Sequence, residues 1–349
     1  MTEHPYHLTD QVPARYYAAL PGILTKIGVD AAAVLDAAQL PLAELSRPDG
    51  MIRLTQLEAL VAAATTLSGR DDLGLLLGRE IRLRSHSLVG YALLASPTVD
   101  YALRLTSRYF RLVFPAFRMR YRVFDGVAEI DYQPSMGMSP ACLSFHIDMV
   151  TAATHVDLEE LLQQKLPAYE LALSLPGASA ARLAGYRRLM PQVRLKFAGL
   201  SHPGMCFRLP AHLISREPAM ADGASLAVAE QHCRQLLDQM LLRGSIGDWV
   251  KMMLRESAVD LPSIKDLAEM LSISPRTLHR YLHREGLVYR DLFQQERLRR
   301  ARQLLDETRL SITAIAHELG YQDTSNFVRG FRASEGCTPG EYRRNRVLR

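Results

Sequence analysis

Two segments near the C-terminus repeat one pattern of apolar and small residues. The first, "SIKDLAEMLSISPRTLHRYLHREG", begins at Ser263, and the second, "SITAIAHELGYQDTSNFVRGFRASEG", begins at Ser311. The matched pairs are Ile264 with Ile312, Leu267 with Ile315, Ala268 with Ala316, Leu271 with Leu319 and, after a one-residue adjustment in the turn, Leu278 with Phe327 and Leu282 with Phe331. The last quarter of the chain therefore holds two copies of one supersecondary unit.

Each copy has the features of a helix-turn-helix, over about residues 264–286 and 312–336. An alanine in the first helix lets the second helix approach closely, and a tight turn follows at Ser272 or Gly320. Gly320 suits a left-handed turn because it has no Cβ to clash. Ser274 and Asp323 are the residue types that cap a helix N-terminus, so we expect the second helix of each unit to start there.

The second helix of each unit is apolar only at every third or fourth residue, so its other face is left for contacts. Short polar and forked side chains on that face are suited to base edges in a major groove. The expected DNA-binding residues are Arg276, Thr277, His279 and Arg280 in the first unit and Thr324, Ser325, Asn326 and Arg329 in the second.

A single helix, "YRDLFQQERLRRARQLLDET", is predicted between the two units because it carries an apolar stripe. Some 17 residues at 1.5 Å each would give a rod of about 25 Å, which can hold two recognition helices about one DNA turn, or ~34 Å, apart. From Leu261 onward 16 Lys and Arg stand against 11 Asp and Glu, so this region carries the whole net charge of +5. A polyanionic partner is the expected consequence.

The region of about residues 261–346 resembles the AraC/XylS family of transcription factors. The resemblance lies in Arg297, Ala301 and Leu305, Ser311-Ile312, Ile315-Ala316, Gly320-Tyr321, Ser325, Phe327, Arg329 and Phe331, Gly336, Thr338-Pro339 and Tyr342-Arg343. Two positions depart from the family pattern. Gly330 stands inside the second recognition helix, where it costs about 1 kcal/mol against alanine, and Ser272 stands where the family often has glycine.

The first part of the chain predicts an α+β domain. Apolar-periodic segments indicate helices from Tyr16 to about Val113 and over about residues 140–166, and alternating segments flank Asp125-Gly126, a dipeptide typical of hairpin turns. Strand-like "YELALSL", "VRLKFAG" and "MCFRLP" complete an antiparallel sheet of about five strands. The predicted fold is thus an α+β N-terminal domain followed by an all-α domain of two helix-turn-helix units.

We divide the chain into a ligand-sensing domain (residues 1–215), a linker with a helix (216–259) and a DNA-binding domain (260–349). The linker helix, "ASLAVAEQHCRQLLDQMLLR", has an apolar stripe that packs either on its own domain or on a second subunit. "DDLGLLLGREIRLRSHSLVGYALLASPTVDYALRLTSRYFRL" and "MPQVRLKFAGLSHPG" are similar to the arabinose-binding-like N-terminal domain of some family members. That resemblance implies a small-molecule effector and leaves its identity open.

Several polar side chains of the first domain are candidates for effector binding. One interpretation is an anion-binding wall, with an acidic or apolar effector; the other, which we favour, is a solvated helix face. Phe110, Phe114 and Met149 would either line an apolar cavity or belong to the core. The ligand-binding candidates are Arg82, Arg84, His86, Tyr91, Arg104, Arg108 and Arg111.

Enzyme signatures are missing from the sequence. There is no GxSxG elbow, no phosphate loop and no dinucleotide fingerprint, and the four cysteines form no CxxC pair. His279 and His283 have a zinc-binding spacing but lack the glutamate of a metalloprotease motif. We therefore expect no catalytic residue, no metal and no cofactor.

The sequence as a whole predicts a bacterial, sequence-specific transcriptional regulator controlled by a small-molecule effector, with activation as the favoured sign. Double-stranded DNA and RNA polymerase are the expected partners, and the chain is also expected to form a homodimer. No apolar run of 18 residues occurs, and the acidic, proline-containing start does not resemble a signal peptide, so we expect a cytoplasmic protein. The alternatives are a metabolite-binding protein or enzyme whose basic tail serves another role, and a regulator that responds to a protein partner or to its own concentration.

Overall fold

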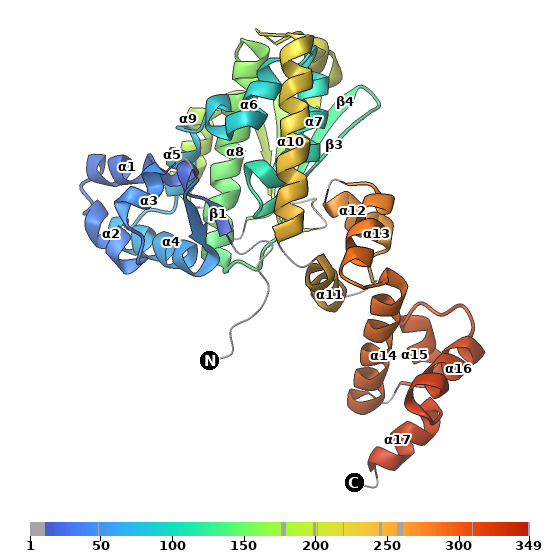
Figure 1. Cartoon of the computed structure of the whole chain (residues 1–349). Helices are drawn as coiled ribbons and strands as arrows, with labels where there is room; N and C mark the ends of the chain where they lie inside the picture. Colours follow the sequence, from blue (N-terminus) through green and yellow to red (C-terminus); the bar gives the residue numbers. More distant parts are fainter. Residues whose placement is uncertain are drawn as a thin grey trace. The chain divides into compact units, whose positions relative to one another are not determined.

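The computed structural model describes residues 11–47, 49–175, 179–197, 200, 202–218, 220–243, 246–256, 261–271, 273–308 and 310–347. The chain forms two compact units, one ending at Met240 and the other beginning at Leu241 (Figure 1). Among the described residues, no helix is both long and apolar enough to cross a membrane.

The N-terminal unit begins with a series of short helices. They are η1 (Ala14–Tyr17), α1 (Leu20–Lys26), α2 (Ala31–Ala37), α3 (Leu42–Ser46), α4 (Leu54–Ser68), α5 (Leu73–Gly78), η2 (Leu83–His86), α6 (Ser87–Leu94) and α7 (Val99–Val113). The sequence indicated helices from Tyr16 to about Val113 and no strand at this end of the chain, whereas β1 (Gln11–Pro13) and β2 (Met51–Arg53) form an antiparallel pair. These strands are too short to show an alternating pattern, so only their pairing reveals them.

A five-stranded sheet follows, in the order β3-β4-β7-β5-β6. β3 (Phe117–Phe124) and β4 (Val127–Pro134) form the predicted hairpin, and positive φ angles at Asp125 (46°) and Gly126 (74°) confirm its turn. The other strands are β5 (Tyr169–Leu173), β6 (Val193–Lys196) and β7 (Met205–Pro210).

One strand pair differs from the predicted antiparallel arrangement. β5 and β6 are parallel, whereas the pairs β3–β4, β4–β7 and β5–β7 are antiparallel. The reason is α9 (Ala180–Leu189), a helix that the sequence reading did not identify. It returns the chain to the same end of the sheet, and such a crossover connects parallel strands.

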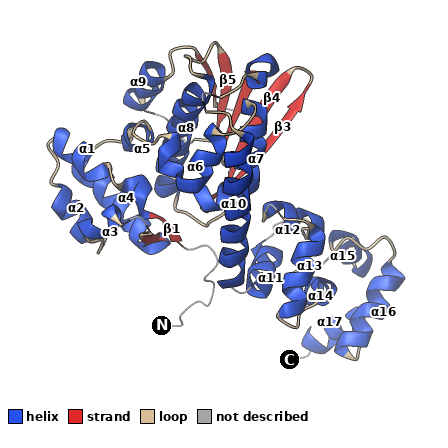
Figure 2. Cartoon of the chain, turned by 45° about the horizontal axis from the view of Figure 1, so that its top comes forward, coloured by secondary structure: helices blue, strands red, loops and turns tan. Residues whose placement is uncertain are grey.

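The long helix α8 (Pro140–Leu162) lies at the centre of this unit, between α5 and the sheet (Figure 2). α5 approaches it closely through two glycines: a Cβ on Gly74 would lie 2.2 Å from Phe145 O, and one on Gly78 would lie 2.2 Å from Met149 O. On the other side, Thr154 donates a hydrogen bond to Tyr132 of β4 at 3.0 Å. α8 therefore fixes the distance between the N-terminal helices and the sheet.

The linker helix α10 (Gly223–Arg243) packs on its own unit. Its buried face contains Leu226, Ala229, Cys233 and Leu237. The Glu230 carboxylate accepts hydrogen bonds from the α7 side chains Tyr101 (3.1 Å) and Arg108 (2.7 Å). The buried face of this helix thus packs on its own unit, as in the first alternative, and the opposite face is exposed.

The described part of the C-terminal unit is helical throughout. Its helices are α11 (Ile246–Glu256), α12 (Ile264–Met270), α13 (Pro275–Arg284), α14 (Tyr289–Glu307), α15 (Ile312–Glu318), α16 (Thr324–Glu335) and α17 (Pro339–Val347). α11 packs on α13 and α14: Glu285 accepts from the amides of Ile246 (2.7 Å) and Gly247 (2.8 Å), and Arg300 donates to Leu254 O (2.9 Å). α11 therefore belongs to the same compact unit as the two helix-turn-helix motifs.

Candidate nucleic-acid interface and small-molecule cavity

The first helix-turn-helix consists of α12 and α13. Ser274 caps α13 by accepting a hydrogen bond from the Thr277 amide at 3.1 Å, as predicted. Leu278, Tyr281 and Leu282 are buried. The opposite face therefore exposes Arg276, His279 and Arg280, with Thr277 half-buried. The turn predicted at Ser272 lies outside the described residues.

The second helix-turn-helix consists of α15 and α16. Gly320 has a φ of 72°, which confirms the predicted left-handed turn. Asp323 caps α16 by accepting from the Ser325 amide at 2.9 Å. Phe327 and Phe331 are buried against Ile315 of α15. This packing sets the other face of α16 toward solvent.

Side chains on the exposed face of α16 line a shallow open groove. Ser325, Asn326 and Arg329 are exposed, and Arg329 donates to Asn326 Oδ1 at 2.5 Å. The groove is lined by Thr324, Ser325, Val328, Arg329, Arg332, Ala333 and Thr338. Arg332 and Thr338 were not among the predicted DNA-binding residues. The spacing of Thr324, Val328 and Arg332, each four residues from the next, was the available signal for Arg332.

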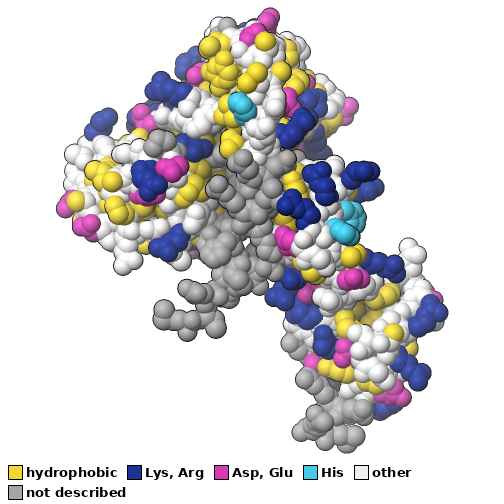
Figure 3. All heavy atoms as spheres, in the orientation of Figure 1, with side chains coloured by type: hydrophobic (Ala, Val, Ile, Leu, Met, Phe, Trp, Pro, Cys, Tyr) yellow, Lys and Arg dark blue, Asp and Glu magenta, His cyan; other side chains and the backbone are white. Residues whose placement is uncertain are grey.

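Basic side chains gather on the C-terminal unit. On the face that Figure 3 shows, Lys and Arg side chains cluster where Figure 1 places α12 and α13. His279 and His283 are both exposed on α13. Among the described residues, no three His, Cys, Asp or Glu side chains come together as metal ligands would. The exposed surface of α13 thus offers cationic and hydrogen-bonding groups to a polyanion.

The helix α14 joins the first helix-turn-helix to the second and packs on the second. Its 19 residues give a length of about 28 Å. Ala301 and Leu305 are buried in one cluster with Ile315, Phe327 and Phe331. α14 therefore holds α16 in a fixed position relative to its own axis.

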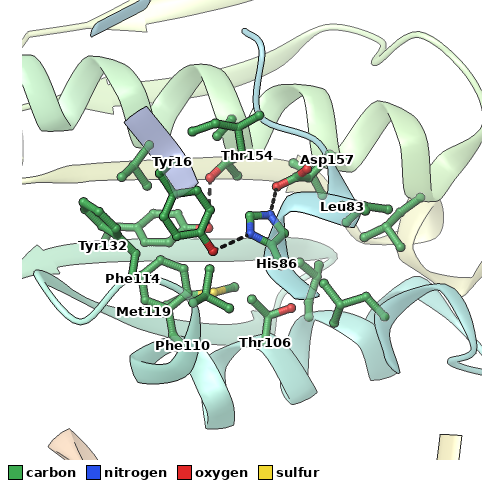
Figure 4. A pocket seen from close by; sticks show the side chains of 18 of the residues that line it. Tyr16, Leu83, His86, Thr106, Phe110, Phe114, Met119, Tyr132, Thr154 and Asp157 are labelled. Atoms are coloured by element: carbon green, nitrogen blue, oxygen red, sulfur yellow. Dashed lines mark hydrogen bonds and ion pairs between the residues drawn. The ribbon is translucent and has the colours of Figure 1, made fainter. Parts of the chain in front are cut away.

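A small cavity lies inside the N-terminal unit, with a volume of about 60 Å³ (Figure 4). Its walls come from η1, η2, α6, α7, α8 and the first two strands of the large sheet. The lining residues are Tyr16, Ile81, Leu83, His86, Leu93, Leu103, Thr106, Phe110, Val113, Phe114, Met119, Tyr132, Met149, Val150, Ala153, Thr154, Asp157, Leu158 and Leu161. Most of this surface is aliphatic or aromatic.

Polar groups converge at one side of the cavity. His86 lies between two partners, with Nε2 2.8 Å from Asp157 Oδ2 and Nδ1 3.0 Å from the Tyr16 hydroxyl (Figure 4). Burial alone would lower the pKa of His86, but the Tyr16 hydroxyl and the Asp157 carboxylate outweigh it and raise the pKa to about 10. His86 and Asp157 therefore form a buried ion pair at neutral pH.

The structure separates the predicted ligand-binding residues. His86 lines the cavity, together with Phe110, Phe114 and Met149. Tyr91 is 46% exposed. Arg82 is half-buried and donates to the carbonyl of Ile81 at 3.0 Å, and Arg84 is exposed. Of the candidates in this segment, only His86 faces the cavity.

The arginines of α7 point in different directions. Arg104 and Arg108 are exposed and pair with Asp100 (2.9 Å) and Glu230 (2.7 Å). Arg111 is buried, and burial lowers its pKa to about 10. None of the three is among the residues that line the cavity. The placement of Arg104 and Arg108 agrees with the solvated-face interpretation of this stripe.

Tyr16 and Asp157 line the cavity but were not identified from the sequence. They lie far apart along the chain, in η1 and α8, and neither belongs to a recognisable motif. Only the packing of these two elements around η2 brings both side chains to His86. No local signal was available to find them.

Known proteins share both parts of this architecture. The family model described as "Arabinose-binding domain of AraC transcription regulator, N-term" matches residues 28–198, and a helix-turn-helix model matches residues 267–345. The ornithine utilization regulator of Pseudomonas aeruginosa is 28% identical over 342 residues, which covers 98% of this chain and 99% of that protein. The regulator VqsM of the same organism is 26% identical, over 79% of this chain and 84% of that protein.

The crystal structure of the regulator CdpR from Pseudomonas aeruginosa has 26% sequence identity and a TM-score of 0.44, over 89% of this chain and 95% of that one. The two family models together span both units, and the full-length relatives are transcriptional regulators. The chain therefore belongs to the AraC family of transcriptional regulators, with an arabinose-binding-type N-terminal domain and a DNA-binding helix-turn-helix domain at its C-terminus.

Proposed function

We propose that this regulator binds a two-box operator through α13 and α16 and activates transcription by contacting RNA polymerase. The observation that carries the proposal is that each of these helices is held by a buried apolar face and exposes a polar, partly basic face. In α13 the buried residues are Leu278 and Leu282, and in α16 they are Phe327 and Phe331. A helix held in this way can enter a major groove without losing its packing.

The base and phosphate contacts are assigned to the exposed faces of the two helices. An arginine in each, Arg280 or Arg329, has the fork that pairs with guanine or with phosphate oxygens. The remaining contacts come from shorter polar side chains. The proposed set is Arg276, Thr277, His279 and Arg280 on α13, and Thr324, Ser325, Asn326, Arg329 and Arg332 on α16.

A homodimer is part of the proposal, formed through α10. Val228 and Leu236 lie eight residues apart on this helix and are 57% and 46% exposed. Residues at this spacing share one face of a helix. A second copy of the chain would cover that apolar face and would place two binding units on one operator.

We further propose a cytoplasmic protein without catalytic activity. His86, the histidine among the residues that line the cavity, is held in its charged form between Asp157 and the Tyr16 hydroxyl, so it has no free nitrogen with which to take a proton from a nucleophile. The cavity is therefore assigned to an effector and not to a substrate.

The test starts with the full chain and a pool of random DNA duplexes. Repeated selection should enrich sequences with two non-identical boxes, and a shift assay should then give an affinity for the selected site at least ~1000-fold above that for random DNA at the same salt concentration. A reporter gene behind the selected site should respond to the regulator in cells. Equal affinity for selected and random duplexes would contradict the proposal and would favour a metabolite-binding protein whose basic region serves another role.

A further inference from the structure

We propose that the cavity of the N-terminal unit binds a small molecule without net charge, whose polar end donates a hydrogen bond to Asp157 Oδ1 and accepts one from the Tyr16 hydroxyl. The inference rests on the proposed function in one respect, namely that this molecule is the effector. The rest of the small molecule is apolar and lies among the aliphatic and aromatic side chains that line the cavity.

The polar end follows from the hydrogen bonds around His86. His86 lies 2.8 Å from Asp157 Oδ2 and 3.0 Å from Tyr16 Oη. In its charged form the imidazole ring has two N–H donors and no acceptor, and it then donates to both of these oxygens. The Tyr16 hydroxyl is then an acceptor toward His86, and its own hydrogen remains to be donated. Among the described residues the only partner of this hydroxyl is His86.

Asp157 supplies the complementary group. Its second oxygen, Oδ1, is buried and has no hydrogen-bond partner among the described residues. Leaving a buried carboxylate oxygen unpaired is unfavourable, so a donor that enters the cavity gains this contact. Asp157 is one of the residues that line the cavity, so a guest whose polar end reaches Oδ1 finds an acceptor there, next to the Tyr16 hydroxyl.

The charged side chains that line the cavity disfavour an ionic guest. The cavity is lined by one cation, His86, and one anion, Asp157, which already neutralise each other at 2.8 Å. A carboxylate or an ammonium group brought into this space would lose its hydration without a counter-charge. The buried cation Arg111 is not among the lining side chains.

The apolar side chains that line the cavity disfavour sugars and amino acids as guests. Thirteen of the nineteen lining residues are aliphatic, sulfur-containing or phenylalanine side chains. The lining residues Thr106 and Thr154 already donate to Ala102 O and to the Tyr132 hydroxyl, so a polyhydroxylated molecule would bury more hydroxyl groups than the remaining polar atoms can pair. An apolar chain or ring that carries a single hydroxyl group leaves none unpaired, and a primary amide leaves only its second N–H.

Size limits the guest further. An engineered cavity of about 150 Å³ admits benzene, so about 60 Å³ admits only a few heavy atoms unless the walls move. Met119 and Met149 line the cavity, and methionine side chains adapt their shape readily. A linear guest of about five carbons is therefore a suitable probe.

The experiment uses the full chain and four probes with one apolar body: 1-pentanol, pentanamide, pentanoate and pentylamine, with L-ornithine and L-arabinose as further comparisons. Thermal unfolding at pH 7 and titration calorimetry measure binding at millimolar concentrations. The alcohol and the amide should raise the melting temperature with increasing concentration, whereas the two ions, ornithine and arabinose should not. Stabilisation by pentanoate or pentylamine equal to that by pentanol would overturn the inference, as would the absence of binding by the alcohol and the amide.

Tyr16→Phe tests the polar end, and Tyr169→Phe is its control. Tyr169 is also buried and bonded to a histidine, with Oη 2.9 Å from His155 Nδ1, but it does not line the cavity. Removing the Tyr16 hydroxyl should weaken pentanol binding roughly tenfold, while Tyr169→Phe leaves it unchanged. Equal losses in the two variants would contradict the assigned contact.

If Tyr16→Phe does not fold, Ala153→Leu replaces it, because the larger side chain fills the cavity and should abolish pentanol binding. The affinity of each protein for the selected DNA is measured in parallel. Intact sequence-specific DNA binding with no probe binding would refute this inference alone. Loss of sequence-specific DNA binding with normal probe binding would refute the proposed function and leave the cavity assignment standing.

Discussion

The guanidinium carbon of Arg297, on α14, lies 3.5 Å from the centroid of the Tyr321 ring, in the turn between α15 and α16. Nε and Nη2 of Arg297 are buried without hydrogen-bond partners in the described structure. Burial lowers the pKa of Arg297 from its ordinary value. The Tyr321 ring in turn contacts Phe327 of α16, with centroids 5.4 Å apart. Arg297 therefore connects α14 to the second recognition helix.

Arg297→Ala should lower the free energy of unfolding of the C-terminal unit by about 1–2 kcal/mol, because it removes a partly desolvated cation–π contact. Denaturant unfolding can be followed by the fluorescence of Trp249, the one tryptophan of the sequence, which is buried in α11 of the same unit. Arg302→Ala is the control, since Arg302 lies on the same helix and forms a long ion pair with Glu335, at 3.9 Å, in place of a contact with the Tyr321 ring. A loss below ~0.5 kcal/mol in both variants would show that the Tyr321 contact contributes little.

Arg280→Ala and Arg329→Ala should each weaken binding to the selected operator by about 1–3 kcal/mol, because each removes a base or phosphate contact from its own box. Footprinting should place the loss in one box for Arg280 and in the other for Arg329. Arg302→Ala again serves as the control and should bind normally. Unchanged affinity in both recognition-helix variants would mean that these faces do not meet the DNA.

A protomer should read two non-identical boxes that together span roughly 17–20 base pairs. α13 and α16 expose different side chains, and we expect α14, which is about 28 Å long, to hold them about one DNA turn apart. Insertion of about five base pairs between the boxes turns one of them to the opposite face of the duplex. The fragment from Leu241 to Arg349 should then lose its tight binding. A second duplex, with about ten inserted base pairs, keeps both boxes on one face of the DNA and tests whether one box alone suffices for binding. Tight binding after the five-pair insertion would exclude simultaneous contact by both helices.

Gly330→Ala and Gly320→Ala should change stability in opposite directions. A Cβ on Gly330, inside α16, has only Tyr321 Oη nearby, at 3.9 Å, so alanine should stabilise the C-terminal unit by about 1 kcal/mol through its helix propensity. Gly320 has a φ of 72°, which strains an L-residue by about 1–2 kcal/mol. Trp249 fluorescence during denaturation measures both changes, and a destabilising Gly330→Ala would show that the missing side chain serves the packing of α16.

His86 should make stability depend on alkaline pH. Its pKa is raised from the ordinary value of 6.5 to about 10 in the folded protein. A raised histidine pKa stabilises the folded state fully below pH 6.5, and this contribution is lost as the pH rises toward 10. The stability difference between the wild type and His86→Gln should therefore shrink between pH 6.5 and pH 10. Thermal unfolding across this range measures it, and a constant difference would show that His86 is neutral in the native state.

Much of the C-terminal unit was predictable from the sequence because its determinants are local. The caps at Ser274 and Asp323 and the turn at Gly320 act within a few residues of their positions. The apolar spacing that buries Leu278 and Phe327 is likewise contained in one helix. The same holds for the hairpin at Asp125-Gly126. Which face of each recognition helix is exposed follows from this spacing alone.

The cavity and the sheet order depended on contacts between distant segments. The parallel pairing of β6 with β5 required α9. Tyr16 and Asp157 meet His86 only because η1 and α8 pack against η2. Arg104, Arg108 and Arg111 share one stripe on α7, but the neighbours of this helix decide that two are exposed and one is buried. The sequence by itself determined the helices of the C-terminal unit, their caps and the repeat, because short-range forces set them. The burial of individual side chains and the choice of their partners depend on long-range packing, so only the tertiary structure decided them.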